Sequence, residues 1–287
     1  MSEWQPWIGR EALAEDVLGE SLARRWCAAF DLALPEDGVM PQGIHFCLCT
    51  PDAPTGALGE DGHPLRDDSP QSFLPPVPLP RRMWASSSIA FHAPLAIRQR
   101  IARRSRILSV EEKSGRSGAM VFVEVEHETQ GDGALAVREV QTLVYREAAA
   151  PDAPLQPPAP ATAGTFAPDA YDVHRTIVPD PRLLFRYSAL TFNTHRIHYD
   201  APYATKVERY RGIVVHGPLT ASLLLQLAAR TVGENRLRHF AFRGLSPAIA
   251  DEPLHLVARH DDSGLALAAF AADGRQVTEA SARLAPG

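Results

Sequence analysis

RYSALTFNTHRIHYDAPYATKVERYRGIVVHGPLTASLLLQLAA, residues 186–229, is the stretch from which the rest of the chain is interpreted. Its second part predicts a buried helix over 218–232, because apolar residues fill most helical positions and proline is favoured in a first turn. Its first part places a polar cluster directly before that helix: Thr191, Asn193, His195, His198, Tyr199 and Asp200. So many polar and ionisable groups beside an apolar element indicate a functional site.

The composition excludes several classes of function. The 287 residues carry a net charge of -5, so no basic surface for nucleic acid is expected. The chain has no charged-then-apolar leader and no apolar run near the roughly 20 residues that cross a bilayer. Cys27, Cys47 and Cys49 are too few for a disulfide framework, and His45 beside them completes no set of metal ligands. We therefore expect a cytoplasmic protein without metal, nucleic-acid or membrane partners.

The N-terminal region predicts a helix followed by an antiparallel sheet. Apolar residues recur at three- and four-residue steps over 10–33, which indicates an amphipathic helix. Residues 43–50 predict a short strand, and the proline-rich residues 51–80 predict an extended loop held by apolar anchors, because each proline removes a backbone donor. Turn sequences then separate four predicted strands, over 88–91, 101–110, 120–128 and 134–145.

An alanine- and proline-rich segment separates two similar parts of the chain. It lacks hydrophobic periodicity, which is typical of a linker. We therefore divide the chain into an N-terminal half, residues 1–147, a linker, residues 148–169, and a C-terminal half, residues 170–287. The C-terminal half predicts strands over 172–178 and 183–192, the helix over 218–232, and a strand meander over 239–284.

The two halves also show a weak internal repeat. AFHAPLAIRQRIARRSRI, residues 90–107, aligns with AFRGLSPAIADEPLHLVARH, residues 241–260, and AVREVQTLVYR, residues 136–146, aligns with QVTEASARLA, residues 276–285. Helices combined with antiparallel meanders give an α+β layout. We therefore predict a double hot-dog, in which each of two fused halves is a central helix wrapped by an antiparallel sheet.

The polar cluster and the helix start suggest complementary chemistry. Histidine titrates near neutrality, so His198, just beyond the predicted strand and turn, suits proton transfer. Gly217 permits close backbone approach, and the amides that begin the helix can receive a carbonyl oxygen as it gains negative charge. An ordinary buried histidine and an ordinary capped helix explain each feature taken alone, but the combination favours a catalytic site.

The motifs resemble one family of hot-dog enzymes. TFNTHRIHYD, residues 191–200, followed by VVHGPLT, residues 214–220, resembles the MaoC-like hydratase/dehydratase family. A branch of that family contains mesaconyl-CoA hydratase, itaconyl-CoA hydratase and type 2 hydroxyacyl-thioester dehydratase. Three segments are similar to this branch: FLPPVPLPRRMWA, residues 73–85, GRSGAMVFVEVEHE, residues 115–128, and RYSALTFNTHRIHYDAPYA, residues 186–204.

The resemblance implies a set of site residues. His198 matches the family's catalytic histidine, and Gly217 matches the glycine whose amide receives the thioester carbonyl. Asn193 stands where the wider family has a catalytic aspartate, and an amide cannot take a proton from water. Either His198 makes both proton transfers or a neighbour supplies the second group; the accessory candidates are His195, Asp200 and His216.

The implied reaction is reversible addition of water across the double bond of an α,β-unsaturated acyl-CoA. The expected substrate is a branched C5 dicarboxylyl thioester, mesaconyl-C4-CoA (3-methylfumaryl-CoA) or itaconyl-CoA; CoA is part of the substrate, and no cofactor is expected. The candidates to bind the free carboxylate are Arg186, Arg196 and Arg211, and the arginines of residues 98–106 are candidates for the CoA phosphates. The fold also allows further pairing into a homodimer.

Three alternatives stay open. A 3-hydroxyacyl-thioester dehydratase of fatty-acid synthesis would use the same site. A hot-dog thioesterase would share the carbonyl site at the helix start, although Asn193 is not the acidic residue expected there. A non-catalytic acyl-thioester-binding protein would keep the cluster for structure alone. The N-terminal half has no counterpart of NTHRIH or of the HGP turn and is expected to be degenerate, so its histidines are predicted to be structural: His45, His63, His92 and His127.

Overall fold

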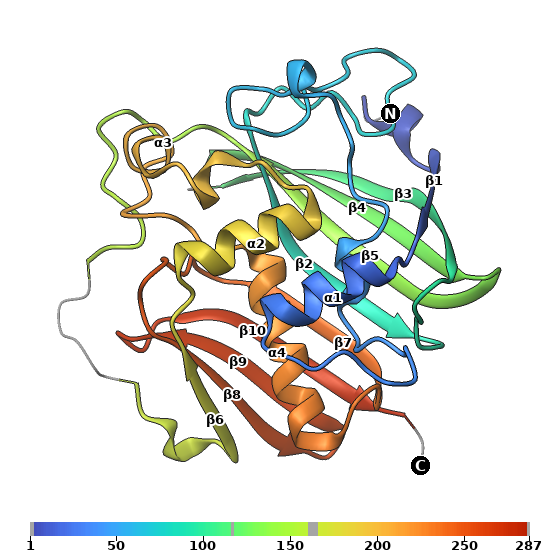
Figure 1. Ribbon diagram of the computed structural model, residues 1–287. Coiled ribbons are helices and arrows are strands. Elements are labelled where there is room, and N and C mark those ends of the chain that lie inside the picture. Colours follow the sequence, from blue (N-terminus) through green and yellow to red (C-terminus); the bar gives the residue numbers. More distant parts are fainter. Residues whose placement is uncertain (1–2, 116–117, 160–165, 286–287) are drawn as a thin grey trace.

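The computed structural model describes residues 3–115, 118–159 and 166–285, which form one continuous antiparallel sheet covered by helices (Figure 1). The sheet order is β1-β3-β4-β5-β2-β7-β10-β9-β8-β6. The strands are β1 (Glu11–Val17), β2 (Arg81–Phe91), β3 (Arg100–Gly115), β4 (Gly118–Gly131), β5 (Ala134–Arg146), β6 (Val173–Ile177), β7 (Leu237–Gly244), β8 (Leu254–Asp261), β9 (Gly264–Ala271) and β10 (Gln276–Leu284). These strands confirm the predicted strands of 88–145, the strand over 172–178 and the meander over 239–284.

The order of strands is symmetric about the β2–β7 pair. The strands β5, β4, β3 and β1 follow outward from β2 as β10, β9, β8 and β6 follow outward from β7. Ile89 pairs with Phe240 across the join. The aligned sequence segments fall on equivalent elements, since one pair runs from β2 into β3 and from β7 into β8, and the other covers β5 and β10. This is the predicted α+β arrangement of fused hot-dog units.

Three helices cover one face of this sheet: α1 (Glu20–Ala29), α2 (Pro181–Thr191) and α4 (Gly217–Val232) (Figure 1). Shorter helices lie in the connections: α3 (Ala201–Lys206), η1 (Gln5–Trp7), η2 (Ile44–Cys47), η3 (Thr55–Ala57), η4 (Pro168–Ala170) and η5 (Arg196–His198). The long helix α4 directly precedes β7. The segment between α1 and β2 has no such helix and holds only η2, η3 and a long loop. That loop reaches the site described below.

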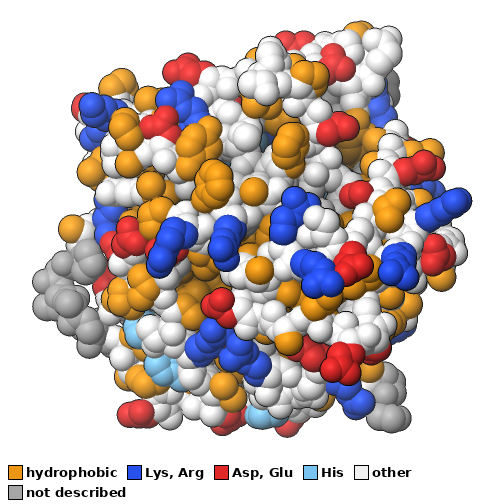
Figure 2. Space-filling view, in the orientation of Figure 1, with side chains coloured by type: hydrophobic (Ala, Val, Ile, Leu, Met, Phe, Trp, Pro, Cys, Tyr) orange, Lys and Arg blue, Asp and Glu red, His pale blue; other side chains and the backbone are white. Residues whose placement is uncertain are grey.

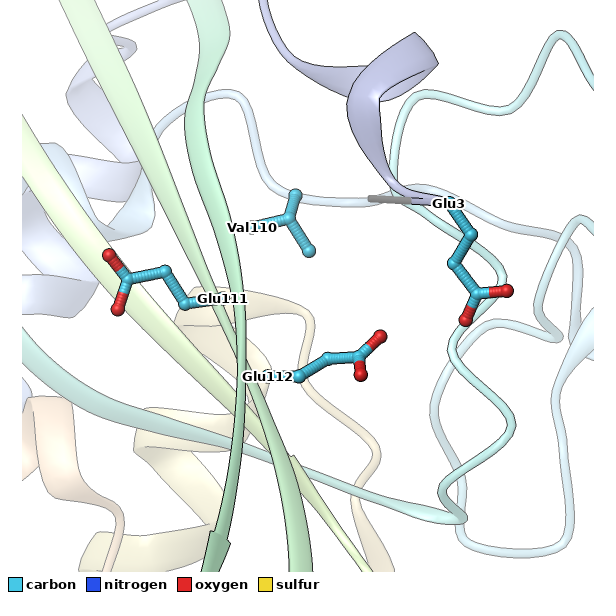
Figure 3. Close-up of a pocket in the computed structure, with 4 residues that line it drawn as sticks. All are labelled: Glu3, Val110, Glu111 and Glu112. Carbon is cyan, nitrogen blue, oxygen red and sulfur yellow. The ribbon is translucent and has the colours of Figure 1, made fainter. Parts of the chain in front are cut away.

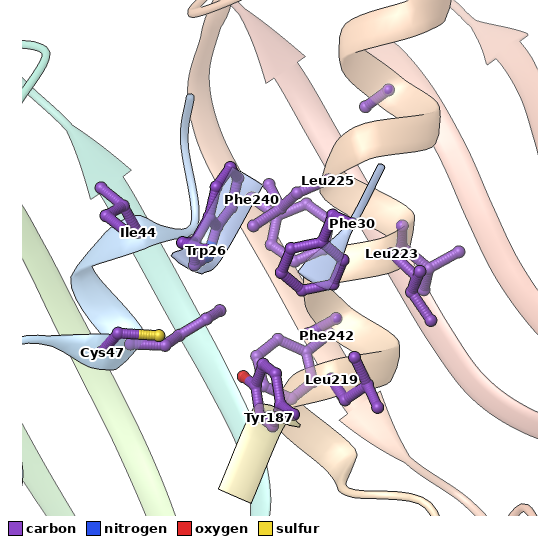
Figure 4. Close-up of a cluster of buried hydrophobic side chains, with 14 of the residues drawn as sticks. Trp26, Phe30, Ile44, Cys47, Tyr187, Leu219, Leu223, Leu225, Phe240 and Phe242 are labelled. Atoms are coloured by element: carbon purple, nitrogen blue, oxygen red, sulfur yellow. The ribbon is translucent and has the colours of Figure 1, made fainter. Parts of the chain in front are cut away.

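The helix α4 is the centre of the hydrophobic core and confirms the predicted helix over 218–232. Pro218 lies in its first turn, and Gly233, with φ 99°, ends it. Leu219 on α4, Trp26 on α1 and Phe240 on β7 are almost completely buried in the cluster shown in Figure 4. Each such side chain contributes about 1.5–3 kcal/mol through burial. The start of α4 is therefore held rigidly against the sheet.

Two predictions for the N-terminal region are wrong. The helix predicted over 10–33 is β1 followed by α1, because residues 11–17 alternate in exposure and pair with β3, and Gly19 begins the shorter helix. The strand predicted over 43–50 is η2, which starts from Gly43 in a left-handed conformation with φ 108°. His45 and Cys47 are therefore both buried in one helical turn instead of lining one face of a strand.

The strand predicted over 183–192 is also wrong, because these residues belong to α2. Asp180 caps the helix by accepting a hydrogen bond from the Leu183 N–H at 2.9 Å, and Pro181 follows in the first turn. The side chains at three-residue steps face the core: Leu184, Tyr187 and Leu190. An aspartate and a proline before an apolar run are a helix-start signal that outweighs the β-propensity of the run.

The proline-rich loop over 51–80 is ordered by apolar anchors, as predicted. Val77 is buried with Ile107 and Val123 in a second core cluster, against which Phe73 and Leu74 pack. In the expected linker, the backbone of Gln156 donates to Arg209 O and accepts from Arg211 N, and residues 160–165 lie outside the described part of the chain. No helix among the described residues has the length and apolar character to cross a membrane.

Candidate active site

The stretch 186–229 brings three histidines into contact, with His195 and His216 on either side of the buried His198. The chain leaves α2, passes through the turn at Asn193, forms η5 and α3, and returns to the start of α4. His198 lies at the end of η5 and is 8% exposed. The sequence predicted His198 just beyond a strand and a turn. In the structure it follows the helix α2 and a turn.

His198 is held in one tautomer by a backbone carbonyl. Its Nδ1 lies 2.7 Å from Val214 O, and a carbonyl only accepts, so Nδ1 carries the hydrogen. Nε2 then has an available lone pair and no hydrogen-bond partner among the described residues. Burial lowers the pKa of His198 to about 3, and the nearby His195 adds to the effect. The ring is therefore neutral near pH 7, with Nε2 in the form that can accept a proton.

His216 connects this ring to the start of α4. The two rings stack with their centroids 3.6 Å apart and an interplanar angle of 18°. His216 Nε2 is 2.9 Å from Ser188 Oγ, and burial lowers the pKa of His216 well below its ordinary value. The next residue, Gly217, is the first of α4, where the N–H groups have no partner within the helix. A neutral base and a helix N-terminus, which favours negative charge, are thus fixed side by side.

Asn193 closes the turn between α2 and η5. Phe192 adopts a left-handed conformation with φ 50°, and the Asn193 N–H donates to Ser188 O at 2.9 Å. The side-chain Oδ1 accepts a hydrogen bond from the His195 N–H at 3.0 Å. The side-chain amide hydrogens are therefore the part of Asn193 that remains to meet a ligand.

Asp200 and Arg196 are engaged with each other. Asp200 Oδ2 accepts from Arg196 Nε at 3.0 Å and Nη2 at 2.7 Å, while Oδ1 caps α3 through Tyr203 N at 3.1 Å. The Arg196 guanidinium lowers the pKa of Asp200 and also lies 4.2 Å from the centre of the Tyr203 ring. Both side chains hold the loop between η5 and α3 in place.

The other two candidate arginines lie apart from this cluster of contacts. Arg211 forms a two-point ion pair with Glu252, whose Oε2 is 2.6 Å from Nη2. Arg186 is exposed on α2, with Nη1 3.2 Å from Ala28 O. Figure 2 shows arginine and lysine side chains across the face that α1 and α2 cover. Of the three candidates, Arg186 has no carboxylate partner among the described residues.

A model of the family Htd2, hydroxyacyl-thioester dehydratase type 2, matches residues 43–250. The chain belongs to this family. It is 42% identical to mesaconyl-C(4)-CoA hydratase of Chloroflexus aurantiacus over 99% of this chain and 98% of that protein. Among solved structures, a MaoC-like dehydratase from Phytophthora capsici has a TM-score of 0.70 at 12% identity and covers 97% of both chains. A Mycobacterium tuberculosis protein with a double hotdog fold has a TM-score of 0.56 at 15% identity and covers 96% of both chains.

Family membership makes this MaoC-like protein a hydro-lyase of the hydroxyacyl-thioester dehydratase and hydratase type. An acyl thioester is accordingly the class of substrate that its site must accept. The structure adds a feature of the enzyme that the sequence motifs did not indicate. Residues 58–64 of the N-terminal region form a small turn, closed by a bridge between Leu58 and Pro64, which lies directly against the turn 193–196.

This turn brings further acidic and basic groups to the enzyme's histidine cluster. His63 packs against His195 with ring centroids 4.1 Å apart and an interplanar angle of 37°, and His195 lies edge-on to His198 at 5.5 Å. Burial lowers the pKa of His195 to about 3. His63 was predicted to be structural because no catalytic motif surrounds it in the N-terminal half; the only sequence signal was the glycine-rich GEDGHP before the proline-rich loop.

One set of metal-ligand side chains is present in the described part of this hydro-lyase. Ligand atoms of Asp61, His63 and His195 all lie within 4.8 Å of one another. Asp61 Oδ2, however, is 2.9 Å from His63 Nδ1 and Oδ1 accepts from the His63 N–H at 3.0 Å, so the carboxylate is already paired. The arrangement is that of a hydrogen-bonded carboxylate–imidazole pair.

A surface hollow elsewhere on the dehydratase is poorly suited to its substrate. It has a volume of about 670 Å³ and lies against β3, with lining residues Glu3, Val110, Glu111 and Glu112 (Figure 3). Three carboxylates would repel the phosphates and carboxylate of an acyl-CoA. The histidine cluster is therefore the better candidate for the active site.

A second buried polar group lies in the core of the dehydratase. Ser87 Oγ donates to Glu139 Oε1 at 2.5 Å and accepts from Trp84 Nε1 at 2.8 Å, while His45 Nε2 is 3.8 Å from Glu139 Oε2. Burial raises the pKa of Glu139 to about 7 and lowers that of His45 to about 3. Both side chains are therefore mainly uncharged at moderately acidic pH.

Glu139→Gln should make stability less dependent on pH. Because the pKa of Glu139 rises from 4.5 in the unfolded chain to about 7 in the folded enzyme, the folded state binds this proton more tightly. The resulting stabilisation is complete below pH 4.5 and is lost as pH rises through 7, at about 1.4 kcal/mol per pKa unit. Between pH 5 and 8.5, the free energy of unfolding of the wild type, measured in urea, should fall by about 2–3 kcal/mol more than that of the variant. Equal losses in the two proteins would contradict the raised pKa.

Proposed function

We propose that this protein adds water reversibly to the double bond of a branched C5 dicarboxylyl-CoA, mesaconyl-C4-CoA or itaconyl-CoA. The observation that carries the proposal is the arrangement of His198, whose Nδ1 is bound to Val214 O and whose ring stacks on His216 beside the first residue of α4. The 42% identity to mesaconyl-C(4)-CoA hydratase along nearly the whole chain supports this choice of acyl group.

The mechanism uses two groups of the site together, the His198 ring and the Gly217 N–H. Water attacks the β-carbon while His198 Nε2 takes its proton, so a C–O bond forms as an O–H bond breaks. The π electrons move toward the thioester, and the Gly217 N–H at the start of α4 binds the oxygen that becomes an enolate. A proton delivered to the α-carbon then gives the hydroxyacyl thioester. Asn193 would orient the water through its side-chain amide.

Of the three candidate arginines, Arg186 is the one that is not already paired with a carboxylate among the described residues and is available to bind a free substrate carboxylate. Arg196 and Arg211 each have a carboxylate partner already, Asp200 and Glu252. Separating either pair would leave a carboxylate unpaired. The free energy lost with the existing ion pair would then offset the free energy gained from the new one. Arg186 is exposed and bonded only to a backbone oxygen, so it can exchange that bond for a stronger one.

We assign different tasks to the proposed halves. Residues 170–287 would carry His198 and Gly217, and residues 1–147 would complete the sheet and supply the turn 58–64, joined through the linker 148–169. The core between the halves supports this division, because Trp26 packs with residues of α4 and β7. All three cysteines are free and buried, which supports a reducing compartment such as the cytoplasm.

One assay tests the proposed reaction. The protein is incubated with mesaconyl-C4-CoA, itaconyl-CoA and crotonyl-CoA while the enoyl-thioester absorbance and the release of free thiol are followed together. Loss of absorbance without thiol is expected, fastest for a dicarboxylyl substrate. Thiol release would replace the hydratase by a thioesterase, and neither signal would favour a binding protein. Faster turnover of 3-hydroxyacyl chains on acyl carrier protein would identify the second candidate, a dehydratase of fatty-acid synthesis. The match to the family Htd2, hydroxyacyl-thioester dehydratase type 2, is the observation that supports this candidate.

Asn193→Asp should keep the fold and retain or raise the rate of hydration. The new carboxylate can still accept the hydrogen bond from the His195 N–H, so the turn is preserved. A negative charge near the histidines should raise their pKa values and strengthen His198 as a base. The check is kcat for the enoyl-CoA together with the melting temperature. A large loss of kcat at an unchanged melting temperature would show that the amide donor itself is required.

A further inference from the structure

The turn formed by residues 58–64 is joined to the catalytic turn by several contacts. Arg196 N–H donates to Asp61 O at 2.8 Å, Thr194 Oγ1 donates to Gly62 O at 2.5 Å, and Arg196 Nη1 donates to Glu60 O at 3.0 Å. The fit is tight, because a Cβ on Gly62 would lie 1.9 Å from Thr194 O. The N-terminal turn is thus built into the site that holds His198.

Asp61 and His63 within this turn form a pair suited to proton transfer. His63 Nδ1 donates to Asp61 Oδ2 at 2.9 Å, which leaves His63 Nε2 without a partner among the described residues. Burial alone would raise the pKa of Asp61, but the hydrogen bonds and charge of His63 outweigh it and hold this pKa at about 2. The side chains are 29% and 21% exposed, so a ligand can reach them. A carboxylate so placed fixes the orientation of the ring and directs Nε2 away from the pair.

The reaction needs a group of this kind. Hydration removes a proton from water and adds a proton to the α-carbon, and His198 accounts for only the first transfer. Asn193 has no proton to exchange in this way, Asp200 is bound to Arg196 and Tyr203, and His216 is 1% exposed with Nε2 bonded to Ser188. His216 Nδ1 has no hydrogen-bond partner in the described part of the chain, but this atom is buried away from a ligand. His195 remains, and it has no hydrogen bond to a carboxylate among the described residues.

We propose that Asp61 and His63 are the second acid–base pair of this active site, contributed by the N-terminal half. In the hydration direction His63 Nε2 gives its proton to the α-carbon as the enolate electrons form the C–H bond, and Asp61 remains ionised throughout. The proton that His198 took from water returns to His63 through solvent, so each cycle consumes one water molecule. This inference rests on the proposed hydratase function and changes the role expected for the N-terminal half.

Several ionisable groups surround Asp61 and His63. His195 faces His63 from the turn before η5, and Glu60 and Arg66 lie near Asp61 along the same loop. Arg82 at the start of β2 and Tyr203 on α3 complete the surroundings. Asp61→Asn removes the carboxylate that orients the His63 ring, so kcat should fall while KM changes little.

The experiment compares His63→Gln and Asp61→Asn with His92→Gln, a control on an exposed histidine of the same half. For an enoyl-CoA substrate, kcat of His63→Gln should fall about 100-fold or more with KM changed little, and the control should match wild type. His63→Ala should regain activity with added imidazole. A purely structural role would lower the melting temperature and would not be rescued by imidazole.

Several outcomes would overturn the proposal. Near wild-type kcat in both variants would remove the pair from the mechanism. Losses of kcat that accompany a lowered melting temperature and are not rescued by imidazole would do the same. Activity lost on dialysis against EDTA and restored by Zn²⁺ would assign the same side chains to a metal. Wild type and variants are also tested for thiol release. If wild type only hydrolyses the thioester, the hydratase proposal fails. The role of Asp61 and His63 is then tested by the effect of His63→Gln on the rate of hydrolysis. If wild type catalyses neither reaction, both proposals fail.

Discussion

His198→Asn should lower kcat for hydration by about 100- to 10,000-fold, the usual contribution of a positioned acid–base group. The asparagine amide can still donate to Val214 O, so the local structure is preserved, but the lone pair presented by Nε2 is lost. KM should change little, because His198 is assigned to the chemical step and not to binding of the substrate. Stopped absorbance assays of the enoyl thioester at saturating substrate measure this loss directly.

The matched control for this variant is His92→Asn. His92 is exposed, and its replacement should leave both kcat and the melting temperature unchanged. The melting temperature of His198→Asn should stay within a few degrees of wild type, since the buried ring is replaced by a smaller group with the same donor. Undiminished turnover by the folded His198→Asn protein would rule out His198 as the base and with it the mechanism proposed above.

Gly62→Ala should lower activity by about 100-fold through displacement of the turn 58–64. Gly62 has φ +88°, and its new Cβ would lie 1.9 Å from Thr194 O, a contact that cannot persist. The turn must move away from residues 194–196, and a displacement of about 1 Å in a catalytic group typically costs about 100-fold in rate. Overpacking of this kind also destabilises the fold by about 1–3 kcal/mol. Both kcat and the free energy of unfolding are measured.

Gly9→Ala separates the backbone effect from the steric one. Gly9 has φ +85°, close to that of Gly62, but nothing lies within 4 Å of a Cβ built there. It should show a backbone penalty of about 1 kcal/mol and an unchanged kcat. If the two variants lose the same activity, or if Gly62→Ala remains fully active, the contact between the turns does not support catalysis.

The candidate site was predictable to the extent that its groups are close in sequence. His198, His216 and Gly217 belong to two motifs joined by a short connection, and the helix that follows is fixed by Pro218 and a run of apolar residues. The structure brings these residues together as stacked rings at the start of α4. The strand predicted over 183–192 is wrong, but the error did not change the predicted site. Both a strand and the helix α2 would end at the turn that contains Asn193.

The roles of the arginines could not be obtained in the same way. Arg196 and Arg211 look like free cations in sequence, but their partners depend on the fold. Asp200 lies four residues from Arg196 and meets it because η5 and α3 form one compact loop, while Glu252 is brought to Arg211 from a distant turn before β8. Ion pairs between distant residues leave no periodic signal in a sequence.

By itself, the sequence determined the strand meanders, the buried helix over 218–232, the α+β class and the chemical types at the site, since these depend on hydrophobic periodicity, turn residues and local motifs. Only the tertiary structure decided that Asp61 and His63 lie against His195. Their approach depends on a loop that replaces a helix before β2 and crosses to the other half of the sheet. Contacts of this kind are made by packing and backbone hydrogen bonds over more than a hundred residues of chain, so no local pattern records them.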